Sequence, residues 1–198
     1  MTLCRPDGPA LVLGSAQDER RIDHGRLADA GVPVVRRRSG GGIVLLVPGQ
    51  SVWIDVDVPA ADVLWEADVG RAFVWLGRAW ADALGDLGVA GPRSHAGPME
   101  EGRWGRLVCF AGLGPGEVTV TGRKLVGIAQ RRTRAAARFQ CAVLLRWEAG
   151  PLVDLLAVGE EERAGMAADL ASCAVGLAEL GVAAAQDEVL AALRARLS

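Results

Sequence analysis

Two segments of this 198-residue sequence carry residue types that could bind and activate a negatively charged ligand. The first is Arg36-Arg37-Arg38-Ser39-Gly40-Gly41-Gly42, which an apolar run follows directly. Consecutive glycines let a backbone come close to a ligand and turn its N–H groups toward an anion. Arginine side chains bind carboxylate or phosphate oxygens in pairs. The segment is neither a P-loop nor a dinucleotide fingerprint, and a plain turn is the alternative interpretation.

The second segment, residues 122–132, places Lys124 just after a predicted hairpin turn, at the start of a strand. Lys124 is the one lysine among 22 lysine and arginine residues. A position that keeps lysine where arginine serves everywhere else indicates a need for a compact ammonium group. Gly127 and Ala129 are small, and small residues in a strand often mark the close approach of a ligand. A twisted edge strand with a solvated lysine is the alternative.

The remaining composition excludes several classes of function. The four cysteines show no CxxC spacing and only two histidines exist, so we expect free thiols and no metal site. The net charge is -2, which gives no reason to expect nucleic acid as a partner. We find neither a signal segment nor an apolar run long enough to cross a membrane, and we expect a cytoplasmic protein.

The apolar pattern predicts strands first and helices last, which is typical of an α+β fold with a mostly antiparallel sheet. We predict a long helix whose buried face runs from Val69 to Leu87, and a helical C-terminal part over about 151–198. No linker divides the chain, so we expect a single domain over 1–198. Strands are predicted at residues 10–13, 32–36, 43–47, 52–58, 107–110, 117–121, 124–130 and 138–147.

Together and in this order, the two segments resemble the lipoate–protein ligase and octanoyltransferase branch of the biotin/lipoate protein ligase family. Its members carry Arg-Arg-x-Ser/Thr-Gly-Gly-Gly and, later, Gly-Lys/Arg-Lys-Ile/Val-x-Gly-Ser-Ala-Gln. The segment Leu-Val-Leu-Gly-Ser-Ala-Gln at residues 11–17 adds to the resemblance, which spans roughly residues 9 to 147. It implies a class II synthetase or biotin ligase-like catalytic core, with a mostly antiparallel mixed sheet flanked by helices and no separate accessory domain.

The resemblance also implies a reaction, the transfer of a lipoyl or octanoyl group to a lysine of a lipoyl-domain protein. In a ligase, lipoate or octanoate would be activated by ATP with Mg²⁺; in a transferase, an acyl carrier protein could bring the acyl group. Lys124 would donate to the acyl carbonyl or phosphate as charge develops there. The other residues assigned to the substrate or adenylate are Arg36, Arg37, Ser39, Gly40, Gly41, Gly42, Gly127 and Ala129.

Cys109 opens a second route. The Cys109-Phe110 pair resembles a Cys-Phe pair of the octanoyltransferases in this family, which use that cysteine as an acyl nucleophile. An ammonium group such as that of Lys124 would stabilise the thiolate form of the cysteine. A buried structural cysteine on a core strand is the alternative.

Five residues, in three segments, depart from the family pattern. Leu46-Val47 stands where His-Asp is usual, Ile128 stands in place of serine, and Gln140-Cys141-Ala142 replaces Gln-His-Gly. Because polar groups have become apolar, a third hypothesis stays open: a catalytically weak protein that binds a lipoyl ligand or a lipoyl domain.

Overall fold

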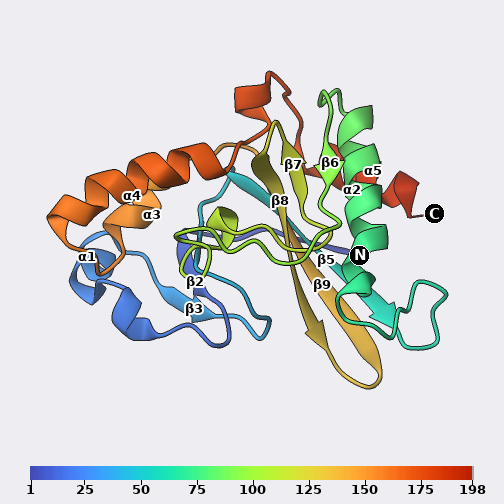
Figure 1. The fold of residues 1–198 in the computed structure, drawn as a ribbon, viewed down its shortest axis with the longest axis horizontal. Helices are drawn as coiled ribbons and strands as arrows, with labels where there is room; N and C mark the ends of the chain where they lie inside the picture. Colours follow the sequence, from blue (N-terminus) through green and yellow to red (C-terminus); the bar gives the residue numbers. More distant parts are fainter. Residues whose placement is uncertain (198) are drawn as a thin grey trace.

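Two sheets organise residues 1–197, the part of the chain that the computed structural model describes (Figure 1). In the larger sheet all neighbouring strands run antiparallel; in order, they are β1 (Thr2–Cys4), β5 (Ser51–Pro59), β9 (Ala136–Leu144), β8 (Arg123–Arg132), β7 (Val118–Val120) and β6 (Arg93–Ser94). The smaller sheet is mixed, because β2 (Ala10–Leu13) runs parallel to β3 (Val34–Arg36) and antiparallel to β4 (Val44–Leu46). The expected α+β class with a mostly antiparallel sheet is confirmed.

The helices form two groups at opposite ends of the molecule (Figure 1). Two of them, α2 (Val74–Asp86) and α5 (Gln186–Arg196), lie against the six-stranded sheet, and α1 (His24–Asp29), α3 (Ala149–Asp154) and α4 (Glu160–Cys173) lie beside the smaller one. Single turns of 3-10 helix are η1 (Glu19–Arg21), η2 (Arg71–Phe73), η3 (Cys109–Ala111) and η4 (Ala178–Leu180). No helix within residues 1–197 is both long and apolar enough to cross a membrane.

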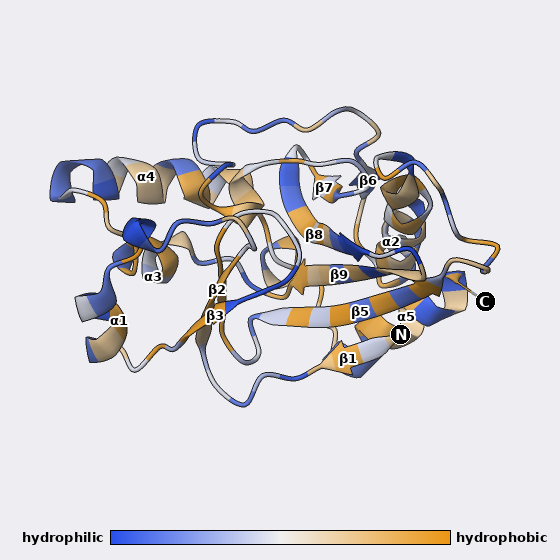
Figure 2. Cartoon of the chain, turned by 90° about the horizontal axis from the view of Figure 1, so that it is seen from below, coloured by the Kyte–Doolittle hydropathy of each residue, from blue (hydrophilic) through white to orange (hydrophobic). Residues whose placement is uncertain are grey.

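The core of the larger sheet follows from the alternation that the sequence shows in β5. Val52, Ile54, Val56 and Val58 are all buried, as a strand with one face on a core requires. Together with apolar residues of β8, β9, α2 and α5 they form one hydrophobic cluster. A second cluster joins β2 to α1, α3 and α4. Figure 2 shows β2 in the hydrophobic colour and the first turn of α4 in the hydrophilic one.

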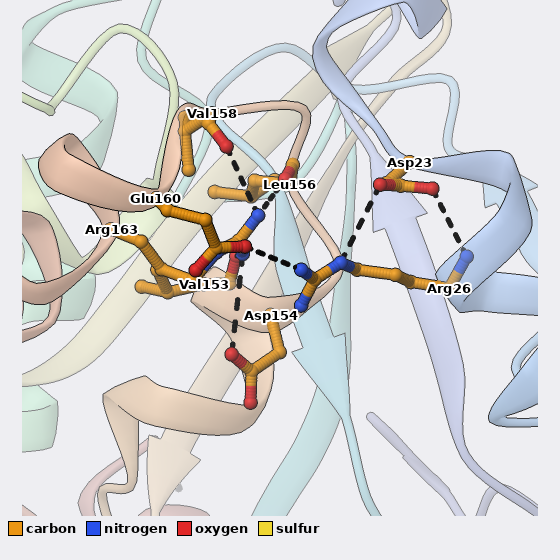
Figure 3. A network of polar contacts seen from close by, with 8 residues as sticks. All are labelled: Asp23, Arg26, Val153, Asp154, Leu156, Val158, Glu160 and Arg163. Carbon is orange, nitrogen blue, oxygen red and sulfur yellow. Dashed lines mark hydrogen bonds and ion pairs between the residues drawn. The ribbon is translucent and has the colours of Figure 1, made fainter.

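A polar network ties the helices of the second cluster together (Figure 3). Arg26 of α1 pairs with Asp23 and with Glu160 of α4. Arg163 of α4 donates to the carbonyl oxygens of Val153, Leu156 and Val158, at and just after the end of α3. Its side chain is mostly buried, so its hydrogen bonds hold α4 against the end of α3 and the residues that follow it.

Two predicted elements differ from the structure. Residues 107–110 do not form a strand: Val108 makes one isolated bridge to Ile43, and the chain then turns into η3. Val69 does not lie on the buried face of the long helix, because α2 begins only at Val74, after η2, and Val69 is exposed. In both places the apolar residues do mark a buried stretch of chain, but the regular strand or helix covers less of it than the pattern predicts.

Candidate functional site

The glycine segment and Lys124 line the same cavity, which has a volume of about 240 Å³. The cavity lies between the residues that follow β3 and the strand β8. Most of its lining residues are apolar or glycine, with a few polar side chains among them, as is usual for a small-molecule site. Its lining residues are Gly40, Gly41, Gly42, Phe73, Met99, Gly105, Cys109, Gly112, Glu117, Lys124, Ile128, Ala129 and Gln130.

Lys124 is buried, with 3% of its surface exposed. Its backbone is fixed on both sides, since it pairs with Thr119 of β7 and its carbonyl accepts from the N–H of Val175. Its Nζ lies 2.6 Å from Glu117 Oε2, 2.8 Å from the carbonyl oxygen of Cys109 and 2.9 Å from that of Gly112. The solvated lysine that was the alternative interpretation is therefore wrong.

Glu117 is the residue of this site that the sequence analysis missed. It directly precedes β7 and is 5% exposed. Oε2 accepts the backbone N–H of Gly114 at 2.6 Å in addition to Lys124, and Oε1 accepts the N–H of Ile128 at 3.0 Å. The available signal was a lone acidic residue between a Gly-Pro-Gly turn and a short apolar strand, a pattern that is too common to stand out.

The glycine segment is held against the chain that carries Cys109. The N–H of Ile43 donates to the carbonyl of Leu107 at 2.7 Å, and the N–H of Cys109 donates to the carbonyl of Ile43 at 3.0 Å. A Cβ atom on Gly42 would lie 2.5 Å from the backbone nitrogen of Cys109. Glycine at this position therefore serves the close approach of two backbones, which in turn brings Cys109 to the cavity.

The N–H groups of Gly40, Gly41 and Gly42 donate to no acceptor within residues 1–197. Gly40 and Gly41 are exposed, and Gly41 has a φ of 99°, a conformation that favours glycine. Free backbone donors next to a cavity are the feature that binds anions in glycine loops. The segment can therefore receive a carboxylate or a phosphate.

The two arginines and the serine assigned from the sequence do not line the cavity. Arg37 is buried and donates to the carbonyl oxygens of Gly40 and Gly42 at 2.8 and 2.9 Å. Arg36 points to the other side, where it binds two backbone carbonyls and pairs with Glu19. Ser39 Oγ donates to Gln140 at 2.6 Å.

Of the remaining residues that the sequence assigned to the site, some line the cavity and one does not. Ala129 lines the cavity, whereas Gly127 does not, and an added Cβ at Gly127 would be 3.4 Å from both Lys124 Cε and the Phe110 ring. Cys109 is half-buried, lines the cavity and begins η3 instead of lying on a core strand. Lys124 also borders a second cavity of about 210 Å³, where burial raises the pKa of the Cys173 thiol.

Within residues 1–197, no group of three or more His, Cys, Asp or Glu side chains is arranged to hold a metal ion. Glu117 is the one acidic residue that lines the cavity with the glycine segment, and its carboxylate already binds three donors.

Comparison with known proteins gives both a family and a fold. The family described as lipoyl protein ligase A/B catalytic domain matches residues 1–198. A bipartite lipoate protein ligase with its E2 lipoyl domain, from Thermoplasma acidophilum, is similar in structure with a TM-score of 0.76 at 20% identity, over 96% of this chain and 67% of that one. A putative lipoate protein ligase from T. acidophilum with bound lipoic acid gives 0.70 at 18% identity, over 96% and 68%.

A third similar structure, a lipoate-protein ligase A bound with ATP, gives a TM-score of 0.68 at 19% identity, over 96% of this chain and 68% of that one. No curated protein matches this chain. At such identities the structural likeness shows a shared fold, and the family match covers the whole chain.

Proposed function

Because this chain belongs to the lipoyl protein ligase A/B catalytic domain family, we propose that it transfers a lipoyl or octanoyl group to a lysine of a lipoyl-domain protein. The observation that carries the proposal is the shared cavity, in which free glycine N–H groups, Lys124 and Cys109 surround one space. The similar structures support it, since one binds lipoic acid and another is a ligase described with its lipoyl domain. The cytoplasmic location stays a prediction from the sequence.

An acyl chain suits the apolar part of this cavity, which Phe73, Met99 and Ile128 form. Its carbonyl end would lie toward Lys124, the cation among the lining residues. An ammonium group that donates to a carbonyl oxygen stabilises the negative charge that develops there during acyl transfer. A second cavity also borders Lys124, which supports a site where two substrates meet at this side chain.

The ATP-dependent route requires a place for phosphate oxygens. The N–H groups of Gly40 and Gly41 fit this need, because they are exposed and have no acceptor among the described residues. In this route ATP activates the lipoate carboxylate, pyrophosphate leaves, and the acceptor amine then displaces AMP. Glu117 does not fit Mg²⁺, because Lys124 and two backbone N–H groups already occupy its carboxylate.

The position of Cys109 favours a second route. Its Sγ would attack the acyl carbonyl of a thioester donor, so that a new C–S bond forms and the donor thiol leaves with a proton. The acceptor lysine would then attack this enzyme thioester, which forms the amide and releases the Cys109 thiol. Lys124 binds the carbonyl oxygen of Cys109 at 2.8 Å, so the nucleophile and the oxyanion donor of this route would be held together.

The test is intact-mass analysis of a purified lipoyl domain after incubation with the protein. One arm supplies lipoate with ATP and Mg²⁺, and the other supplies octanoyl-acyl carrier protein. We expect the mass of the domain to rise in at least one arm. If it rises in neither, the catalytic proposal fails and a binding protein is the better description.

A Cys109→Ser variant separates the two routes, with Cys4→Ser as the matched control. The ligase route survives both substitutions, whereas the transferase route is lost with Cys109 alone. The enzyme itself can also be analysed for an acyl adduct. Because Lys124 is the one lysine and is buried, an adduct on the enzyme that hydroxylamine removes indicates a thioester.

A further inference from the structure

The ammonium group of Lys124 has no donor left for a ligand. It has three N–H bonds, and their acceptors are the Glu117 carboxylate and the carbonyl oxygens of Cys109 and Gly112, at 2.6, 2.8 and 2.9 Å. A ligand oxygen can therefore bind Lys124 only after one of these three acceptors has left. Which acceptor leaves decides how Lys124 acts on the ligand.

The carboxylate of Glu117 is the acceptor that stays. Besides Lys124, it accepts the N–H groups of Gly114 and Ile128, at 2.6 and 3.0 Å. If it moved away, these two buried backbone donors would lose their acceptor, at a cost of about 1–3 kcal/mol each. The same movement would separate two opposite charges that are both almost fully buried, which is costlier still.

The two carbonyl groups are the acceptors that can leave. Both are uncharged, and they bracket the single 3-10 turn η3 instead of belonging to a sheet. Cys109 and Gly112 line the cavity, so a carbonyl released there can turn to water or to the ligand. Their exchange separates no pair of opposite charges, and a hydrogen bond from the ammonium to a carbonyl, worth about 1.5–3 kcal/mol, is replaced by an equivalent bond to the carbonyl of the ligand.

We propose that Glu117 is a positioning residue that stays bound to Lys124 during the reaction, while the acyl carbonyl oxygen replaces the carbonyl of Cys109 or Gly112. The identity of that ligand rests on the proposed function. In this arrangement Lys124 and Glu117 together carry no net charge, and Lys124 acts as a hydrogen-bond donor whose direction Glu117 fixes. Where the carbonyl of Cys109 is the one replaced, the exchange also frees the backbone of Cys109 when the acyl group arrives.

The sole lysine makes the pairing directly measurable. Protein that carries ¹⁵N-labelled lysine gives one side-chain ammonium signal, which can come only from Lys124. In the wild-type protein we expect slow exchange of these protons with water, and in Glu117→Gln an exchange at least about tenfold faster. Lipoamide, which offers a neutral acyl carbonyl, should shift the signal in the wild type while the slow exchange persists. Glu101→Gln, at an exposed carboxylate, is the control and should change nothing.

A double-mutant cycle on kcat/KM separates positioning from a merely structural role. Glu117→Gln should lower the rate of acyl transfer at least about tenfold, and less than about twofold when Lys124→Met is already present, because neighbours that act as a unit are not additive. Glu117→Asp, which keeps the charge, should retain more activity than Glu117→Gln.

Equal losses with and without Lys124 would overturn the proposal, as would a Lys124 signal that Glu117→Gln leaves unchanged or that lipoamide does not shift. A wild-type protein that never acylates a lipoyl domain would instead refute the proposed function. The exchange of the labelled ammonium protons still decides the pairing of Glu117 with Lys124 in that case.

Discussion

The substitution Gly42→Ala tests how the glycine segment places Cys109 at the cavity. The new methyl group would lie 2.5 Å from the nitrogen of Cys109 and 2.6 Å from the carbonyl carbon of Val108, which are backbone atoms and cannot turn aside. Two backbone hydrogen bonds at Ile43 hold the segments together there, at 2.7 and 3.0 Å. The segments must therefore separate, and both hydrogen bonds must lengthen.

The size of the effect follows from these contacts. Overpacking of this kind costs about 1–3 kcal/mol, and weakening two backbone hydrogen bonds adds roughly 1 kcal/mol. We expect the free energy of unfolding to fall by about 2–4 kcal/mol, which for a domain of this size lowers Tm by roughly 5–15 °C. Acyl transfer should fall as well at a temperature where the variant is folded, because the carbonyl of Cys109 that binds Lys124 moves with the backbone.

Gly40→Ala is the matched control, since a Cβ atom at Gly40 meets no atom within 4 Å. Its free energy of unfolding should stay within about 0.5 kcal/mol of the wild type. Urea denaturation of both variants gives the comparison, and lipoyl-domain mass analysis gives the activity. If Gly42→Ala is as stable as Gly40→Ala and as active as the wild type, the two backbones are not in contact as described, and the reasoning about the site fails.

Three further predictions concern the parts that surround the site. Arg163→Met should lower the free energy of unfolding by about 2–3 kcal/mol in urea, because it removes the three hydrogen bonds from α4 to the carbonyl groups of residues 153, 156 and 158, whereas Arg20→Met at an exposed position should have little effect. Burial raises the pKa of the Cys141 thiol from 9.0 to about 12. The folded state therefore keeps a proton that the unfolded chain loses above about pH 9, and stability should fall by up to about 1.4 kcal/mol per pH unit from there toward pH 12; Cys141→Ala should remove this part of the slope. Arg37→Lys should lower kcat/KM at least about tenfold with a small effect on Tm, because a lysine cannot hold the carbonyls of the loop as a planar guanidinium does; unchanged kinetics would show that this grip is dispensable.

The sequence predicted the fold class because its strands alternate clearly, as β5 shows. It also indicated that the glycine segment and Lys124 belong together, and the structure brings them to one cavity; their roles in binding, like the single-domain organisation, stay predictions. The family resemblance supplied the idea of an activated acyl group. The pairing of Lys124 with Glu117 was not visible, because no sequence pattern predicts the register shift between Val118 and Thr119, where β7 pairs with β8 directly after Glu117.

The role of Arg37 was equally hidden. An arginine beside a glycine run suggests a ligand for the guanidinium group, yet a tight loop also leaves its own carbonyl groups without donors. Arg37 binds those of Gly40 and Gly42 from a buried position. Sequence alone cannot separate these two uses of arginine, because both place the residue next to the same glycines.

The structure also shows which of the residues that depart from the family pattern lie at the cavity and which do not. Leu46 ends β4, opposite Ala10, and packs against the core, and neither it nor Val47 lines the cavity that contains Lys124. Cys141 is fully buried under α2. Of these positions, Ile128 alone reaches the cavity, where its side chain adds apolar wall and its N–H group binds Glu117. The backbone donor at this position would be the same with serine, so the change removes a hydroxyl from the wall and leaves the anchoring of Glu117, and through it of Lys124, intact.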